Sequence, residues 1–201
     1  MQTFSAKDLC TRSCMQIRFF SENPDKRPKA NQNIAYGESF QHKIAESVEG
    51  LIGEEMRGTY VGEGVMINFS NDIVTDKSVI EVKSVSYDRP VEEWYLKSSL
   101  LQCAVYSSLL RKTDGSLVTA KFFTDMGNPC VETKISNLSD YLLVFGNDRY
   151  SVRVKDADSI VRFIVRKANA SLTWEGARRF DSEYKHREYD VLSSYFEFSK
   201  L

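Results

Sequence analysis

The sequence predicts an α/β (α+β) fold in which a central mixed β-sheet is flanked by helices. Two observations predict it. Helical patterns alternate with short stretches rich in β-branched and aromatic residues, and those stretches form two groups with a helix between them. Of the 201 residues, 42% are hydrophobic and 12% are aromatic, which is typical of a globular protein. We therefore expect residues 1–201 to form a single domain.

Two helices separated by a surface loop are expected in the N-terminal part. In SAKDLCTRSCMQIRFF (5–20), Ser5 is the expected N-cap of a short first helix. The positions at helical spacing are Leu9, Cys10, Ser13 and Ile17. The run SENPDKRPKANQN (21–33) is rich in Pro, Asn and Lys, which predicts a loop. A second, amphipathic helix is expected to start near Gly37, and its apolar positions are Phe40, Ile44, Val48 and Leu51.

Strands are expected from Thr59 onward. The segment YVGEGVMINFSNDIVTDKSVIEVKSVSY (60–87) is broken by GEG, SND and TDK, which predicts two or three antiparallel strands. A helix follows over 92–112 and ends in basic residues before TDG. Its expected apolar face is formed by Trp94, Leu101, Val105 and Leu109.

More strands and a capped helix are predicted in the second half of the chain. The segments SLVTAKFFTD (116–125) and PCVETKI (129–135) are expected to be strands, and LLVFGNDRYSVRV (142–154) a hairpin that turns at GND. The segment 156–172 predicts a helix capped near Asp156. The charged and aromatic run from Trp174 to the end is expected to be partly helical.

Charge and hydropathy indicate which broad classes of protein the sequence fits. The 27 basic and 28 acidic residues nearly cancel, so the net charge does not indicate a nucleic-acid partner, although a local basic groove is compatible with it. No stretch approaches the roughly 20 apolar residues of a membrane span, and the N-terminus lacks the apolar middle of a secretory signal. We expect a cytoplasmic protein without a membrane partner, in which Cys10, Cys14, Cys103 and Cys130 are buried small residues.

Two charges lie on one face of an otherwise apolar strand. In VIEVKSV (79–85), Glu81 and Lys83 alternate with apolar residues such as Ile80 and Val82, so the two-residue period places both charges on one side. A solvent-exposed face is one explanation. The other involves Asp72, nine residues before Glu81, which a turn at TDK would bring beside Glu81. Two carboxylates suit a divalent cation, and a lysine can orient or deprotonate a water or stabilise charge on a phosphate. This arrangement predicts a metal-dependent phosphodiesterase site.

The segment NDIVTDKSVIEVK resembles the motif of the PD-(D/E)XK nuclease superfamily, with Asn71 in place of the proline. Gln102 and Tyr106, spaced i and i+4 on the next helix, are similar to the QxxxY motif of the RecB-like and lambda-exonuclease-like branch. In that branch the two residues border the active site. The resemblance covers roughly residues 5–106 and implies a restriction-endonuclease-like core, with the catalytic part at about 34–125 and a C-terminal hairpin and helices at about 138–201.

Metal ligands are also implied by this resemblance. Asp72, Glu81 and the Val82 carbonyl would hold one or two Mg²⁺ or Mn²⁺ ions, and Lys83 would position the attacking water. The segment GESFQHKIAE resembles a G-x-x-x-H helix whose histidine is a ligand, so His42 is a candidate. The Gly37–His42 spacing is one residue too long, and Gln41 or Glu38 are alternatives for that place.

An iron–sulfur cluster is not expected. The N-terminal segment resembles the S-x-x-x-L…C-P-x-x-F-Y opening of relatives that bind a [4Fe–4S] cluster through four cysteines. The chain has no cysteine after Cys130, so the C-terminal trio of those relatives is missing, and Cys14 is expected to be buried packing.

The function implied is a DNA nuclease, most simply an exonuclease of recombination, repair or phage DNA processing. Two alternatives stay open: an inactive nuclease-fold module that binds nucleic acid or protein, and a restriction-type or RNA endonuclease. The expected partner is DNA with single- or double-stranded ends. A helicase or a single-strand-annealing or recombination protein as a second partner is compatible with the sequence, and so is a homo-oligomer. Candidate nucleic-acid contacts are Arg178, Arg179, Lys185 and Arg187, together with Lys26, Arg27 and Lys29 in the loop. For the C-terminal run, a solvated charged helix is the alternative.

Overall fold

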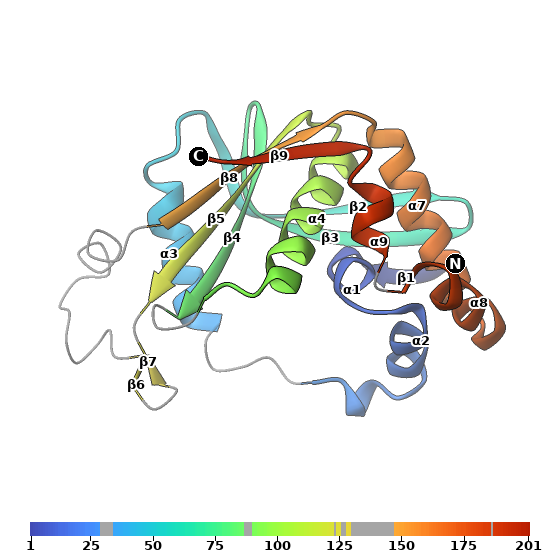
Figure 1. Cartoon of the computed structure of the whole chain (residues 1–201). Helices are drawn as coiled ribbons and strands as arrows, with labels where there is room; N and C mark the ends of the chain where they lie inside the picture. The colour runs from blue at the N-terminus through green and yellow to red at the C-terminus, as the bar shows by residue number, and fades with distance from the viewer. Residues whose placement is uncertain (29–33, 87–89, 123, 126–127, 130–146, 186) are drawn as a thin grey trace.

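Strand β3 pairs with three other strands of a seven-stranded mixed sheet (Figure 1). The structure is a computed structural model that describes residues 1–28, 34–86, 90–122, 124–125, 128–129, 147–185 and 187–201. The strands of the sheet are β1 (Gln2–Ser5), β2 (Leu51–Gly62), β3 (Val65–Thr75), β4 (Ser78–Ser86), β5 (Asp114–Phe122), β8 (Asn147–Val154) and β9 (Phe196–Lys200). A separate two-stranded sheet pairs β6 (Thr124–Asp125) with β7 (Asn128–Pro129).

The pairing of the strands is both parallel and antiparallel. β3 pairs with β2 in antiparallel fashion along most of its length, with β1 in parallel near its start and with β4 in antiparallel fashion near its end. β4 and β5 are parallel, and β5, β8 and β9 continue the sheet in antiparallel order. The predicted central mixed sheet is therefore confirmed.

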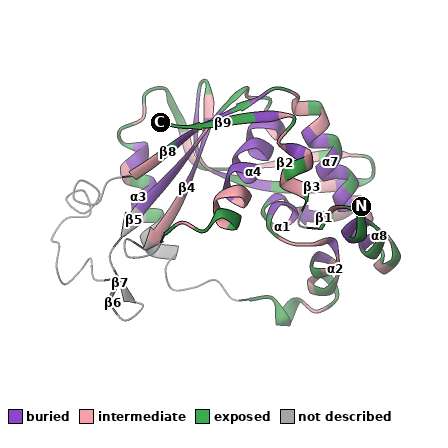
Figure 2. Cartoon of the chain, in the orientation of Figure 1, coloured by how far each residue is buried: buried purple, intermediate pink, exposed green. Residues whose placement is uncertain are grey.

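Helices cover both faces of this sheet. They are α1 (Ala6–Thr11), α2 (Cys14–Glu22), α3 (Ile34–Ala45), α4 (Glu93–Leu109), α7 (Ala157–Ala170), α8 (Trp174–Tyr184) and α9 (Glu188–Leu192), with a 3-10 turn η1 (Pro24–Lys26). On one face, Phe40 and Ile44 of α3 pack with Ile80 and Val82 of β4. On the other, α1, α4 and α7 form the larger hydrophobic cluster (Figure 2). No helix within the described residues has both the length and the apolar character that a membrane crossing needs.

Helix α4 is buried on nearly all sides from Ser99 to Ser108. A close approach to β5 makes this possible, because a Cβ at Gly115 would lie 2.7 Å from Cys103 Sγ and 2.8 Å from Ser107 Oγ. The prediction that Trp94 belongs to the apolar face was wrong, since Trp94 is 66% exposed at the first turn of the helix. Of the predicted face, Leu101 and Val105 are buried.

Several predicted boundaries were wrong. The first helix is two helices, because Ser13 starts α2 with a capping box in which its side chain accepts from the Gln16 amide. Helix α3 already includes Ile34 and ends at Ala45, and Leu51 is the first residue of β2. The predicted turn at GND fails because Asn147 and Asp148 belong to β8, where they pair with Ala120 and Thr119.

Other predictions in the second half are confirmed or untested. Asp156 caps α7 by accepting from the Ser159 amide, as expected. The C-terminal run contains α8 and α9, and it ends in β9 at one edge of the sheet. The predicted strand PCVETKI falls on residues of which all but Pro129 lie outside the described part of the chain.

The N-terminal helices are held by residues from the far end of the sequence. The Asp181 carboxylate accepts from the amides of Cys14 and Met15 at 2.8 and 2.9 Å, at the positive N-terminus of α2. The Lys167 ammonium, 1% exposed, donates to the Leu9 carbonyl at 2.7 Å. These contacts hold α1 against α7 and α2 against α8.

Candidate active site

The β3–β4 hairpin brings Asp72 and Glu81 side by side, as the sequence predicts. Its last ladder pair is Ile73 with Ile80, so the next residues outward are Asp72 and Glu81. Past the ladder, Asp72 Oδ2 accepts from the Val82 amide at 2.7 Å, which fixes the orientation of the carboxylate. The turn is held by Thr75, whose hydroxyl oxygen accepts from the Ser78 amide. The local sequence NDIVTDKSVIE thus determines the geometry of the two acids.

All five predicted catalytic side chains line one pocket of about 620 Å³. Asp72, Glu81 and Lys83 come from the hairpin, and Gln102 and Tyr106 come from α4. The pocket also contains residues that sequence reasoning missed. They come from the end of β1, from α1 and from the β2–β3 hairpin: Ser5, Lys7, Arg57, Gly58, Thr59, Asn68, Phe69 and Ser70.

Glu81 is a buried carboxylate with one oxygen unsatisfied. Its side chain is 1% exposed, Oε1 accepts from the Lys83 ammonium, and Oε2 has no partner among the described residues. Burial raises the pKa of Glu81 to about 7, against the opposing effect of Lys83. Burial also raises the pKa of Asp72, although Lys83 and the Val82 amide counteract the effect. The two acids are therefore kept in an environment that favours their neutral forms.

Lys83 stays protonated at neutral pH. Burial by itself lowers the pKa of its ammonium, but the combined charges of Glu81 and Asp72 outweigh burial and raise it above the usual value. The side chain is 17% exposed, so it reaches the pocket from a mostly buried position. Glu81 and Lys83 face the pocket and each other, which explains why an otherwise apolar strand carries two charged side chains.

Gln102 and Tyr106 form a hydrogen-bonded pair at the wall of the pocket. Gln102 Nε2 donates to the Tyr106 hydroxyl oxygen at 2.9 Å, and both side chains are buried. The Tyr106 ring also lies 6.4 Å from the ring of Phe69, centroid to centroid. The pair is therefore positioned by α4 packing and by strand β3 together.

His42 is not brought into the pocket. Its side chain is 63% exposed, with Nδ1 3.2 Å from Glu54 Oε1 and Nε2 3.6 Å from Glu46 Oε1. The alternative residue Gln41 is the one that turns inward, and its Nε2 donates to the Asp72 carbonyl at 2.9 Å. The prediction of His42 as a metal ligand is corrected on this geometry. The packing of Phe40 and Ile44 against the sheet turns Gln41 inward and leaves His42 on the exposed side of α3.

The carboxylate pair has the chemistry of a divalent cation site. Hard cations prefer carboxylate oxygens, and Glu81 Oε2 is a buried oxygen without a hydrogen-bond donor. No group of three or more His, Cys, Asp or Glu side chains suited to a metal occurs among the described residues, so water or substrate oxygens would have to complete the shell. Mg²⁺ commonly binds in this way, through one or two carboxylates. The contribution of the Val82 carbonyl stays a prediction, since the structure shows the Val82 amide bonded to Asp72.

Binding of Mn²⁺ or Mg²⁺ is expected to stabilise the protein. A cation that binds only the folded state adds about 1.4 kcal/mol of stability at roughly ten times its Kd, which raises the melting temperature by a few degrees. Melting curves in EDTA, Mg²⁺ and Mn²⁺ measure this shift, and Glu81→Gln is expected to remove it. The exposed Glu49→Gln variant is the control. A shift that persists in Glu81→Gln would place the cation elsewhere.

The predicted basic contacts lie outside this pocket. Arg178 and Arg179 are exposed on α8, and Arg187 is exposed between α8 and α9. Lys185 lines a second cavity of about 940 Å³, formed by α1, α2, the start of α4 and α9. In the N-terminal loop, Arg27 pairs with Asp8, Lys26 lies over the Phe19 ring, and Lys29 is outside the described residues. A role for these residues in nucleic-acid binding stays a prediction.

The described cysteines are packing residues, as expected. Cys10, Cys14 and Cys103 are buried free thiols. Burial raises the pKa of Cys14 to about 11 and that of Cys10 to about 12, which makes both poor thiolates. Cys130 lies outside the described residues.

Known proteins resemble this chain in fold rather than in sequence. No protein-family model matches it, and no curated protein matches it. Six solved chains match, and one of them is described as the crystal structure of SSO0001. That structure has a TM-score of 0.54 and 17% identity, over 94% of this chain and 85% of the other. At this identity the likeness supports the fold alone.

Proposed function

We propose that this protein is a divalent-metal-dependent nuclease that hydrolyses phosphodiester bonds in DNA. The observation that carries the proposal is the Glu81 carboxylate, buried beside Asp72 and Lys83 with one oxygen lacking a donor. Burying an ionisable group without a complete set of partners costs several kcal/mol, so such a group is typical of a functional site. The resemblance of NDIVTDKSVIEVK to the PD-(D/E)XK motif supports the same chemistry.

Each side chain has a distinct task in this proposal. Asp72 and Glu81 would hold the cation, which when bound acidifies a water and offsets negative charge on the phosphate. Asp72 is oriented for this by the Val82 amide. Lys83 remains an ammonium, so it acts as a hydrogen-bond donor and a positive charge toward the water or the phosphate rather than as a base. Gln102 and Tyr106 would limit how the substrate enters.

The test is cleavage of end-labelled linear single- and double-stranded DNA and of closed circular DNA. Cleavage is expected with Mg²⁺ or Mn²⁺ and not with EDTA. Sparing of the circle would indicate an exonuclease, and nicking of the circle an endonuclease. RNA of the same sequence tests the RNA endonuclease alternative. If no substrate is cleaved and the cation shifts no melting curve, the proposal fails and the nuclease-fold binding module becomes the better description.

A further inference from the structure

The polar lining of the pocket continues from the carboxylates along the β2–β3 hairpin. Side chains alternate across a strand, so Asn68, Ser70 and Asp72 share one face of β3. The register places Arg57 opposite Ser70 and Thr59 opposite Asn68, on that same face. Thr59 Oγ1 donates to Asn68 Oδ1 at 2.8 Å. We call the row formed by Arg57, Ser70, Thr59 and Asn68 the hairpin track.

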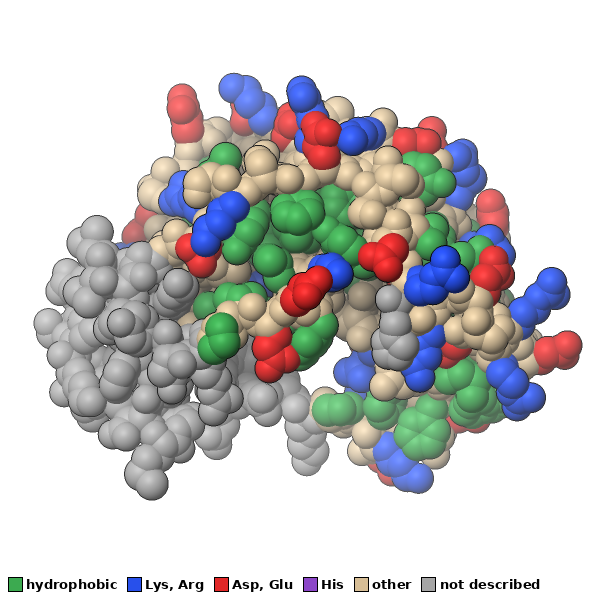
Figure 3. All heavy atoms as spheres, in the orientation of Figure 1, with side chains coloured by type: hydrophobic (Ala, Val, Ile, Leu, Met, Phe, Trp, Pro, Cys, Tyr) green, Lys and Arg blue, Asp and Glu red, His purple; other side chains and the backbone are tan. Residues whose placement is uncertain are grey.

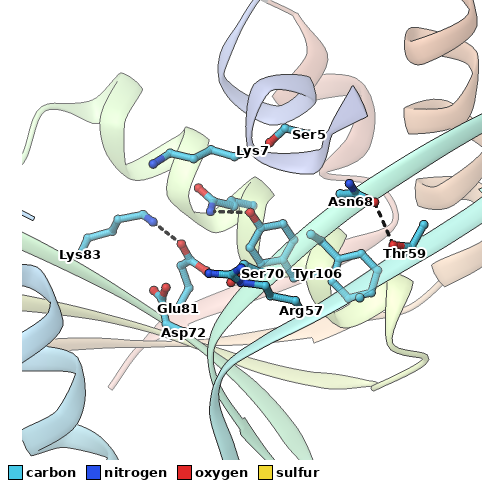
Figure 4. Close-up of a pocket in the computed structure, with 13 residues that line it drawn as sticks. Ser5, Lys7, Arg57, Thr59, Asn68, Ser70, Asp72, Glu81, Lys83 and Tyr106 are labelled. Atoms are coloured by element: carbon cyan, nitrogen blue, oxygen red, sulfur yellow. Dashed lines mark hydrogen bonds and ion pairs between the residues drawn. The ribbon is translucent and has the colours of Figure 1, made fainter. Parts of the chain in front are cut away.

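Among the described residues, two cations at the inner end of this track have no hydrogen-bond or ion-pair partner. Arg57 from β2 and Lys7 from α1 are both exposed and both line the pocket (Figure 4). Within the described part of the chain, neither the Lys7 ammonium nor the Arg57 guanidinium makes a hydrogen bond or an ion pair, whereas Lys83 is held by Glu81. Lys7 is nonetheless close enough to favour the charged forms of Asp72 and Glu81. Both cations are therefore available to an anion.

Local cations matter here because the overall charge is balanced. On the face shown in Figure 3, basic and acidic side chains are interspersed, in agreement with a net charge of −1. Such a surface provides little general attraction for a polyanion. A polynucleotide would need a few well-placed cations, and arginine, with its planar fork of donors, suits phosphate oxygens especially well.

The length of the track fits a strand of several nucleotides. Residues in a strand advance about 3.3–3.4 Å each, so Asn68 lies about 13 Å from Asp72 along β3. Phosphates in one strand of a duplex advance about 3.4 Å per nucleotide along the helix axis. The track therefore extends well beyond the space that one nucleotide at the carboxylates would take.

We propose that the hairpin track, together with Lys7 of α1, binds the nucleic-acid strand next to the cleaved bond, with Arg57 and Lys7 as the phosphate-binding residues. This inference rests on the proposed nuclease function and specifies its substrate class. The substrate is a polynucleotide that lies along β2 and β3, and di- or trinucleotides bind more weakly because they contact only part of the track. Thr59, Asn68 and Ser70 supply neutral hydrogen-bond donors and acceptors to the same strand.

The test measures binding apart from cleavage. Fluorescence anisotropy in EDTA gives the Kd of single-stranded oligonucleotides of 3, 8 and 16 nucleotides for the wild type, Arg57→Ala, Lys7→Ala and Arg57→Lys. The matched control is Arg153→Ala, an exposed strand arginine on β8 that does not line the pocket. Arg57→Ala is expected to weaken binding of the 8-mer and 16-mer by about tenfold and to lower the slope of log K against log salt by about one. Arg57→Lys is expected to restore part of the affinity.

Cleavage kinetics provide the second readout. With Mg²⁺ or Mn²⁺, the loss in Arg57→Ala and Lys7→Ala is expected mainly in KM rather than kcat, because these contacts bind substrate and transition state alike. Wild-type Kd and salt slope in both variants would overturn the inference while leaving the nuclease proposal intact. Absence of cleavage by the wild type would contradict the proposed function instead, and the binding data in EDTA would still decide whether the track holds nucleic acid.

Discussion

Replacement of Glu81 by glutamine is expected to reduce DNA cleavage by on the order of a thousandfold or more. A bound cation contributes several kcal/mol of transition-state stabilisation, and each 1.36 kcal/mol corresponds to about tenfold in rate. Glutamine keeps the size and one oxygen of the side chain but loses the negative charge that the cation needs. Asp72→Asn is expected to have a similar effect, because the site holds only two carboxylates among the described residues.

The loss must be separated from unfolding. Burial disfavours the charged form of Glu81, so a neutral glutamine is compatible with the fold, and Asp72 remains as a counter-charge for Lys83. The melting temperature of Glu81→Gln in EDTA is expected to stay within a few degrees of the wild type. Single-turnover cleavage with Mn²⁺ then compares Glu81→Gln with Glu49→Gln. Equal cleavage by the two variants would contradict a role for Glu81 in the active site.

Lys83→Met is expected to reduce cleavage by about 10²- to 10⁴-fold while cation binding persists. Methionine keeps the length of the stem and removes the charge that the proposal directs at the water or phosphate. The cation is expected to bind at least as tightly as before, since a neighbouring positive charge is lost. Lys77→Met, an exposed lysine in the turn of the same hairpin, is the matched control. Unchanged cleavage by Lys83→Met would contradict a catalytic role.

The pH dependence distinguishes two reasons for that loss. Lys83 lowers the pKa of Glu81, so its removal raises that pKa further and leaves less carboxylate at neutral pH. A carboxyl group with a raised pKa is protonated below that value and ionised above it, so a defect of ionisation alone would disappear as the pH rises toward 9. We expect the defect to persist at pH 9, because the ammonium also acts on the reacting groups. Full recovery would reduce Lys83 to a positioning role for Glu81.

The sequence predicted those parts of the site that depend on neighbours along the chain. Asp72 and Glu81 are joined by one tight turn, so alternation along the strands and the TDK signal are enough to bring them together. Gln102 and Tyr106 are one helical turn apart and share a face of α4 for the same local reason. The mixed sheet with helices on both faces likewise follows from the order of the elements.

The rest of the pocket depends on pairing between distant segments. β1 is four residues long and gains its strand character only by lying parallel to β3, so nothing in QTFS predicts that Ser5 and Lys7 face the carboxylates. Arg57 enters through the register of β2, whose first residue, Leu51, fits the helical spacing of Phe40, Ile44 and Val48 in the sequence. Whether His42 or Gln41 faces inward depends on the rotation of α3, which the packing of Phe40 and Ile44 on the sheet determines.

The hydrogen bonds from Asp181 and Lys167 to the N-terminal helices have a consequence for folding during synthesis. Asp181 holds the start of α2 across 167 residues of sequence, and Lys167 holds the end of α1 across 158. Contacts of such separation form late and slow folding. A growing chain therefore carries the Asp72–Glu81 hairpin long before α1 can settle beside it. We expect a ribosome-bound chain that stops before Asp181 to contain both acids and yet bind substrate weakly, so that competence appears only after Asp181 has been added.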